Sequence, residues 1–409
     1  MADVAATVSP DDPFSGRGAR PFLGFWPEAG DEPAQTSRRE PIVAVAPDGG
    51  VSRGILWLPP VGRPQPSTVI ALAHPRADFA IHYACPLLAA AGFAVCGFGT
   101  RYANNDTDCV HETAAADVRA MVAQLRARGF ANVVLLGNSG GGSLMSLAVA
   151  EAEDPVGICD GFIALAAHPG EGVFMLQVID PSVTDEDDPF SRDPALDMYD
   201  PINGYRTWPQ PCSYHPSWVS GYRVAQRARV ARIDERAKAT DVERDRWRQQ
   251  AKTLEHGSGE WLDARRRAVH FPHMLIHRTL ADPAYLDLSI DPDDRALGTI
   301  FAWPDPFIAN SGFGGLARVM TARGWLSTWS GLSSPAQVAT NLPAVTQPTI
   351  VVHPTADTEI RLRQATAIFD ASGAQDRTYL ELPGVDHYLS GARRGAIDQI
   401  VEWLRSRGF

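Results

Sequence analysis

Residues 133–144, which read VVLLGNSGGGSL, decide the fold of this chain. A run of apolar residues passes into Gly-x-Ser-x-Gly, with Ser139 at its centre, and then into a stretch suited to a helix. This order predicts a buried strand, a tight bend and a helix, with the serine held on the bend. Glycines are needed there because side chains beside the serine would collide with neighbouring backbone. Ser139 is therefore a candidate nucleophile, placed where the amino end of a helix favours developing negative charge.

On both sides of this segment, apolar runs alternate with helical stretches. The predicted strands lie at 68–73, 94–98, 132–136, 161–166, 349–353 and 378–382, and the predicted helices at 83–91, 113–128, 140–152, 361–372 and 392–405. Continuous apolar runs of this kind are typical of parallel strands that crossover helices bury on both faces. Earlier in the chain, 42–45 and 54–58 flank an Asp-Gly-Gly turn signal and predict a hairpin. The fold class is therefore α/β, with a doubly wound, mostly parallel sheet.

The alternation stops between the predicted strands at 161–166 and 349–353. A connection of this length needs structure of its own, and it contains a charged helical stretch at 222–252. Thr240 and Glu243 have the spacing of a capping box, which leaves open a second helix starting there. We therefore divide the chain into an irregular N-terminal arm (1–41), an α/β core (42–168 and 348–409) and a mainly helical cap or lid (169–347).

Composition and charge limit the possible partners. The 409 residues are 44% apolar and 21% charged, as in ordinary globular proteins. The net charge of −11 disfavours nucleic acid and anionic membranes, so a small-molecule substrate is the expected partner, and a homodimer is left open. Five widely spaced cysteines without metal-site spacing predict reduced thiols and no metal or cofactor. With no signal-peptide pattern and no long apolar run, we expect a cytoplasmic protein.

The nucleophile needs a base and an acid elsewhere in the chain. A serine hydroxyl is a poor nucleophile until a base removes its proton, and histidine is the usual base near neutral pH. Of eleven histidines, His387 is the one that follows the last predicted strand. The acid that fixes the imidazole tautomer is predicted to be Asp357, just beyond the preceding strand and thirty residues before His387. Glu359 and Asp386 remain alternatives for that acid.

The chain order Ser139, Asp357, His387 resembles that of the α/β-hydrolase superfamily. The resemblance covers nearly all of residues 42–409 outside the cap. It implies a nucleophile elbow at Ser139 and a lid inserted before the strand that carries the acid. The resemblance does not name a substrate.

The same resemblance implies an oxyanion hole with two backbone donors. One is the N–H of the residue after the nucleophile, here Gly140, and the other comes from the loop after the third strand. That loop reads AHPRADF, from residue 73 to 79, where many members have His-Gly. Because proline has no N–H, the second donor is predicted to be the backbone of Arg76 or Ala77. His74, from the same loop, and Asn138, Trp325 and Trp329 are the candidate substrate-binding residues.

Three functions fit these residues. The leading hypothesis is a serine esterase that cleaves a carboxylic ester or thioester of a mostly apolar small molecule, with an aromatic group as one option, through an acyl-enzyme on Ser139. The alternative is hydrolysis of a carbon–carbon bond in a β-diketone or ring-fission product, or of a lactone or amide. Arg76, Arg101 or Arg323 would then bind the second carbonyl. The third is a ligand-binding protein that keeps the fold without catalysis.

Overall fold

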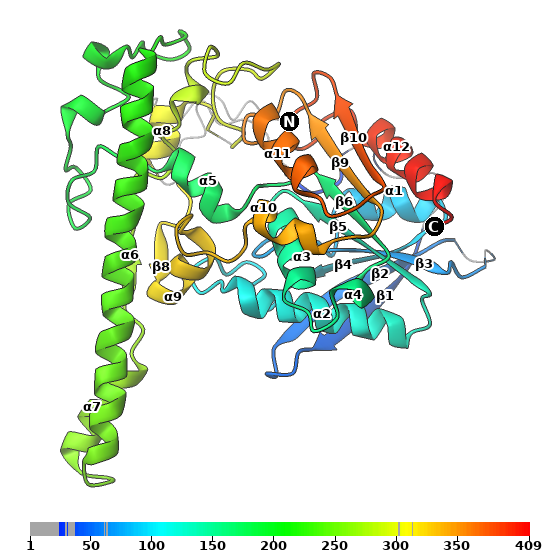
Figure 1. The fold of residues 1–409 in the computed structure, drawn as a ribbon, viewed down its shortest axis with the longest axis horizontal. Coiled ribbons are helices and arrows are strands. Elements are labelled where there is room, and N and C mark those ends of the chain that lie inside the picture. The colour runs from blue at the N-terminus through cyan, green and yellow to red at the C-terminus, as the bar shows by residue number, and fades with distance from the viewer. Residues whose placement is uncertain are drawn as a thin grey trace, which may run out of the picture.

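The core of the protein is a mixed β-sheet with helices on both faces (Figure 1). The computed structural model describes residues 24–28, 31, 37–60, 62, 64–301, 303–312 and 314–409. Within these residues, the sheet has eight strands in the order β1-β2-β4-β3-β5-β6-β9-β10. Their bounds are β1 Arg38–Val45, β2 Val51–Leu58, β3 Thr68–Leu72, β4 Ala94–Gly99, β5 Asn132–Asn138, β6 Gly161–Leu165, β9 Thr349–Pro354 and β10 Arg377–Leu382. The pairs β1–β2 and β2–β4 are antiparallel, and the other pairs are parallel.

The parallel strands read as apolar runs because both of their faces are covered. Every residue of β3, β4, β6 and β9 is buried. One face packs against α1 (Ala84–Ala90) and α12 (Arg393–Ser406), and the other against α2 (His111–Ala127), α3 (Gly141–Ala150) and α11 (Leu362–Ala371). A short helix, α4 (Pro155–Ile158), precedes β6. The doubly wound, mostly parallel sheet is therefore confirmed.

The N-terminal part of the chain differs from the expected arm. The hairpin of β1 and β2 forms as predicted, with the Gly50 N–H donating to Asp48 Oδ1 at 3.1 Å. However, β1 begins at Arg38, so the arm ends earlier than residue 41. Residues 1–23, including Phe22, lie outside the described residues. Phe25 does not stay on the surface but packs edge-on against Phe79 of the core, at 4.9 Å between ring centroids.

The insertion between β6 and β9 combines helices with long irregular segments. Its helices are α5 Glu171–Val178, α6 Pro216–Thr253, α7 Gly259–Val269, α8 Pro306–Ser311, α9 Ala322–Gly324 and α10 Val338–Asn341, with a π-helical turn at Trp325–Trp329. Short 3₁₀ turns lie at Pro194–Leu196, Pro201–Asn203, Pro283–Tyr285 and Leu342–Ala344. The strands β7 (His273–Leu275) and β8 (Val319–Thr321) form a small antiparallel sheet. The mainly helical insertion expected from the sequence thus also contains strands and long turns.

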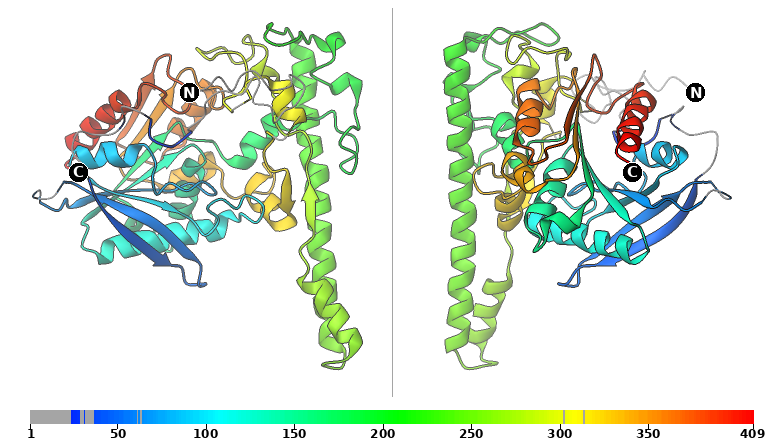
Figure 2. Two further views of the ribbon diagram at one scale, coloured as in Figure 1. Left: turned by 180° about the vertical axis from the view of Figure 1, so that it is seen from behind. Right: turned by 45° about the vertical axis from the view of Figure 1, so that its right-hand side comes forward.

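Helix α6 runs without a break beyond the body of the molecule, with α7 folded back along it (Figure 2). The second helix start left open at Thr240 is therefore wrong. The Thr240 hydroxyl instead donates to the Arg236 carbonyl at 3.1 Å, one turn earlier, so it does not cap a new helix. Glu243 accepts from Trp247 Nε1 at 2.6 Å and does not reach back toward residue 240.

The state of the cysteines and the character of the helices can be compared with the structure directly. All five cysteines are buried and unpaired, as expected for reduced thiols. Among the described helices, none has both the length and the apolar character needed to cross a membrane.

Candidate active site

Ser139 lies on a strained bend between β5 and α3. Its φ is +55°, a conformation that non-glycine residues rarely adopt, and its carbonyl accepts from His168 N at 2.9 Å. The glycines around it are needed for space. A Cβ on Gly137 would lie 2.5 Å from the Gly142 Cα, and a Cβ on Gly141 would lie 2.4 Å from the Ala73 carbonyl oxygen. The strand, bend and helix predicted around Ser139 are all present.

The structure brings Asp357 and His387 to this serine. His387 Nε2 lies 3.0 Å from Ser139 Oγ, and His387 Nδ1 lies 2.7 Å from Asp357 Oδ2. The loops after β9 and β10 carry the acid and the histidine, while the turn after β5 carries the serine. Residues separated by up to 248 positions thus form one line of hydrogen bonds, because the carboxyl ends of parallel strands meet at one edge of a sheet.

The surroundings of Asp357 keep it ionised. It is fully buried, and its second oxygen, Oδ1, accepts from the N–H groups of Glu359 and Ile360 at 2.7 and 3.0 Å. Burial would raise the pKa of Asp357, but His387 and these hydrogen bonds hold it below its ordinary value. Burial likewise disfavours the charged imidazolium of His387, yet Asp357 outweighs burial and raises the pKa of His387. The acid is therefore arranged to stabilise the imidazolium that forms when serine loses its proton.

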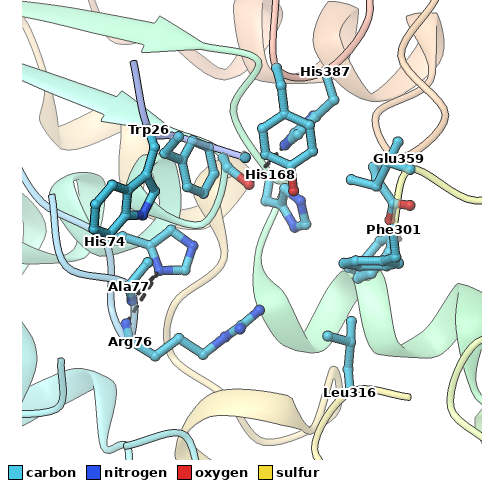
Figure 3. Close-up of a pocket in the computed structure, with 15 residues that line it drawn as sticks. Trp26, His74, Arg76, Ala77, His168, Phe301, Leu316, Glu359 and His387 are labelled. Atoms are coloured by element: carbon cyan, nitrogen blue, oxygen red, sulfur yellow. Dashed lines mark hydrogen bonds between the residues drawn. The ribbon is translucent and has the colours of Figure 1, made fainter. Parts of the chain in front are cut away.

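A cavity of about 520 Å³ opens above Ser139 and His387 (Figure 3). Most of its wall is apolar or aromatic, and it comes from three parts of the chain. The N-terminal segment contributes Gly24, Phe25 and Trp26, the core contributes Ala77 and Tyr388, and the insertion contributes Phe174, Ile300, Phe301 and Leu316. The polar lining residues are His74, Arg76, Ser139, His168, Glu359 and His387. A mostly apolar wall with a few converging polar groups is typical of small-molecule sites.

The loop after β3 differs from the expected oxyanion arrangement. The N–H groups of Arg76 and Ala77 both donate to His74 Nδ1, at 3.2 and 3.1 Å. These two predicted donors are therefore already engaged by the imidazole, because the tight turn after Pro75 directs them back toward their own loop. Gly140, the other predicted donor, occupies the N-cap of α3, where backbone N–H groups have no partner within the helix.

The remaining predicted binding residues do not line the cavity. Asn138 is buried beneath Ser139, where its Oδ1 lies 2.9 Å from His82 Nε2 and its Nδ2 donates to the Leu165 carbonyl. Trp325 is fully buried in the core of the insertion and donates to Asp234 at 2.7 Å. Trp329 packs behind the wall, with the Arg76 guanidinium 4.9 Å from its ring centroid. These side chains are used for packing because the insertion needs a core of its own.

Glu359 is a cavity residue that we considered only as an alternative acid. Its side chain lines the cavity while its backbone N–H donates to Asp357, and Tyr285 of the insertion donates to its carboxyl group at 3.1 Å. Burial raises the pKa of Glu359 to about 8. Asp386, the other alternative, accepts from Ser390 N and is not within hydrogen-bond distance of His387.

Sequence reasoning missed a buried polar cluster next to the nucleophile. Glu171, at the start of α5, is 1% exposed and lies 3.7 Å from His74 Nε2, from Arg76 Nε and from His168 Nδ1. Neither oxygen of its carboxyl group makes a hydrogen bond with the described residues. Burial raises the pKa of Glu171, although Arg76 acts in the opposite direction. No local pattern marks Glu171, because only the fold brings α5 beside the loop at residue 74.

Other candidate groups have structural partners. Arg101, considered for binding a second carbonyl, forms ion pairs with Asp48 and Asp117, at 2.6 Å each, and does not line the cavity. Within the described ranges, no group of three or more His, Cys, Asp or Glu side chains could hold a metal ion.

Solved structures can be compared with this arrangement. DcsB in complex with its substrate analogue has a TM-score of 0.51 at 13% identity, over 90% of this chain and 99% of that chain. A hypothetical protein from Pseudomonas aeruginosa has a TM-score of 0.50 at 14% identity, over 95% and 98%. The chain has the α/β-hydrolase fold. The esterase domain of a Rhodothermus marinus protein is a more distant match, with a TM-score of 0.45 at 12% identity, over 90% and 98%.

At these identities, the likeness concerns the α/β-hydrolase fold and not the substrate. No protein-family model and no curated protein matches the sequence.

Proposed function

We propose that this α/β-hydrolase-fold protein is a serine esterase that cleaves a carboxylic ester or thioester of a mostly apolar small molecule. The observation that carries the proposal is the line from Asp357 through His387 to Ser139, with steps of 2.7 and 3.0 Å, at the base of the cavity. Binding alone does not call for an acid, a base and a nucleophile in hydrogen-bond contact. The arrangement therefore favours catalysis over a binding protein of the same fold.

The proposed reaction has two halves. In the first, Ser139 Oγ attacks the carbonyl carbon while His387 Nε2 takes its proton, and the carbonyl oxygen becomes an oxyanion. The tetrahedral intermediate then collapses, the bond to the alcohol or thiol breaks, and His387 protonates that leaving group. In the second half, His387 removes a proton from water as the water oxygen attacks the acyl carbonyl. The bond from that carbon to Ser139 Oγ then breaks, His387 returns the proton to Oγ, and the acid is released. Throughout, Asp357 holds His387 Nδ1–H and stabilises the imidazolium.

The cavity wall supports an apolar substrate. Phe174, Ile300, Phe301 and Leu316 of the insertion line it together with Phe25 and Tyr388, which suits an aliphatic or aromatic group. The volume of the cavity and its mostly apolar lining fit a small molecule better than a polymer.

Hydrolysis of a carbon–carbon bond, lactone or amide uses the same three residues and is the second candidate. The observation that favours it is Arg76, whose side chain reaches the cavity wall and could bind a second carbonyl oxygen. A panel of matched esters, thioesters, lactones, amides and β-diketones measures the preference. A kcat/KM for β-diketones above that for esters would make the second candidate correct.

The first experiment is labelling of the folded protein with a fluorophosphonate probe, followed by mass spectrometry. We expect covalent phosphonate on Ser139 in the wild-type protein and none in Ser139→Ala. Ser146→Ala is the matched control, because Ser146 is a buried serine in α3 whose hydroxyl donates to the Ser143 carbonyl. This control should label like the wild type. A folded wild-type protein that neither labels nor hydrolyses any ester in the panel would contradict the proposed function.

Cellular location and assembly remain proposals. Buried, unpaired cysteines support a reducing compartment, and we propose the cytoplasm. A small molecule is the proposed partner, and a homodimer stays a prediction to be measured by light scattering.

A further inference from the structure

The second hydrogen-bond donor of the oxyanion hole is still unassigned, because Arg76 and Ala77 use their N–H groups within their own loop. Both donate to His74 Nδ1, and a nitrogen that accepts hydrogen bonds carries no proton. Burial, together with the nearby charge of Arg76, lowers the pKa of His74 well below its ordinary value, so the imidazole is neutral. A neutral imidazole whose Nδ1 accepts has its proton on Nε2. The loop therefore presents a fixed N–H donor at the opposite side of the His74 ring.

That donor lies beside the nucleophile bend. A Cβ added to Gly140 would be 2.7 Å from His74 Nε2 and 2.3 Å from Glu171 Oε1, so both groups lie directly against the residue that supplies the first expected donor. His74 and Ser139 line the same cavity, and Figure 3 shows one ring nitrogen of His74 bonded to its own loop and the other turned toward the cavity. Among the described residues, the nearest anionic group is Glu171 Oε1, at 3.7 Å, which is beyond hydrogen-bond distance.

We propose that His74 Nε2–H, together with the Gly140 N–H, binds the oxyanion that forms when Ser139 attacks the substrate carbonyl. This assignment rests on the proposed serine-hydrolase function. It makes His74 a catalytic residue that touches the reacting oxygen, and it gives the N–H groups of Arg76 and Ala77 the task of fixing its tautomer. A donor fixed before the reaction stabilises the transition state without having to reorient.

The Glu171 carboxyl is the group that could oppose an anion at this position. Its charge is offset by Arg76 Nε at 3.7 Å, and burial favours its protonated form, because desolvation penalises a carboxylate. His168 Nδ1 lies 3.7 Å from its other oxygen. At 3.7 Å the carboxyl makes no hydrogen bond with His74 Nε2, and with its charge offset and its protonated form favoured it opposes an anion there less strongly.

Two variants of His74 separate the donor from the loop anchor. In His74→Asn, the amide oxygen can replace Nδ1 as the acceptor for Arg76 and Ala77, but no donor remains at the position of Nε2. In His74→Gln, the amide nitrogen can reach the position of Nε2, but the acceptor near the loop is lost. We expect His74→Asn to lower kcat for an ester by about 10²–10³-fold with little change in KM. His74→Gln should retain at least tenfold more activity than His74→Asn.

The order of the two variants decides the assignment. Equal losses, or a smaller loss in His74→Asn, would overturn it and leave His74 as a residue that only holds the loop. A wild-type protein that labels and hydrolyses esters normally, with an unaffected His74→Asn, overturns this inference alone. A wild-type protein that does neither overturns the proposed function itself.

A measurement on the wild-type protein avoids the folding of variants. With ¹⁵N-labelled histidine, NMR should show His74 protonated on Nε2 before reaction. After fluorophosphonate labelling, the phosphonyl oxygen occupies the oxyanion position, and the Nε2 proton resonance should move downfield. Protonation on Nδ1, or no change on labelling, would contradict the assignment.

Discussion

The core and the insertion contribute to the cavity in different ways. The residues proposed for chemistry all follow parallel strands of the core: Ser139 and Asp357 follow the buried strands β5 and β9, and His387 follows the edge strand β10. The apolar wall, in contrast, comes in part from irregular segments of the insertion, such as those carrying Ile300 and Leu316, and in part from the N-terminal segment. Strand ends are held by hydrogen bonds and packing on both faces, which suits groups that must keep a fixed geometry. Loops tolerate change more readily, which suits a wall that selects the substrate.

The two regions also differ in how their helices are buried. In α3, behind Ser139, nine of ten residues are buried. In α6, by contrast, seven of the eight buried residues come before Lys238, and only Ala251 is buried beyond it. The first half of α6 therefore packs on the body, while the second half is covered mainly by α7. The comparison predicts that changes in the core abolish chemistry, changes in the wall alter binding, and changes at the tip of α6 do neither.

Replacement of the acid should have the largest effect. Asp357→Asn keeps the shape but removes the charge that fixes the His387 tautomer and stabilises its imidazolium. We expect kcat to fall by about 10⁴-fold. Asp386→Asn is the matched control, because Asp386 accepts from Ser390 N and not from His387, and it should keep near wild-type turnover. A small loss in Asp357→Asn with a large one in Asp386→Asn would reverse the assignment of the acid.

Trimming the wall should affect binding and leave chemistry intact. Leu316→Ala removes apolar surface from the cavity, so the substrate buries less apolar area when it binds. A loss of about 1.4 kcal/mol of binding free energy should raise KM by roughly tenfold, with kcat little changed. Leu262→Ala serves as the control, because Leu262 is 42% exposed on α7, far along the chain from the cavity segments. Steady-state kinetics on one ester measures both. A fall in kcat with unchanged KM would mean that the insertion takes part in chemistry.

The pH dependence should reflect the core alone. His387 must be neutral to accept the Ser139 proton, so kcat/KM falls as the pH drops through the His387 pKa. Burial works against the charged ring, but Asp357 raises its pKa above the ordinary 6.5. We therefore expect the acid limb of the kcat/KM profile to have its midpoint above 6.5. The midpoint should be the same in Leu316→Ala, and a midpoint below 6.5 in the wild type would contradict the charge balance described.

Removal of the helical hairpin formed by the outer end of α6 and by α7 should have the smallest effect. Replacing residues 240–270 by a short glycine-serine linker deletes the outer end of α6, from residue 240 onward, together with α7. Because this part lies beyond most of the packed residues of α6, kcat/KM should stay within about twofold, or about 0.4 kcal/mol, of the wild type. Light scattering on the same sample would show whether the tip joins two copies. A tenfold loss of activity would mean that the hairpin supports the cavity.

Local patterns by themselves determined the strands, their helices and the bend at Ser139. Buried parallel strands must be apolar along their whole length, and a strained bend needs glycines, so both leave a readable mark on the sequence. Asp357 and His387 could be predicted because each follows a strand whose end lies at the same edge of the sheet. These features depend on residues close together in the chain.

Only the tertiary structure decided which side chains meet around the cavity. The positions of Phe25 and Glu359 at its wall, of Glu171 behind the nucleophile bend, and of Trp325 away from the cavity depend on how the N-terminal segment and the insertion pack on the core. The role of His74 depends on the direction of two N–H groups in a turn that contains Pro75. Such contacts join segments far apart in sequence and are set by shape and hydrogen bonding together, so no periodicity or motif records them.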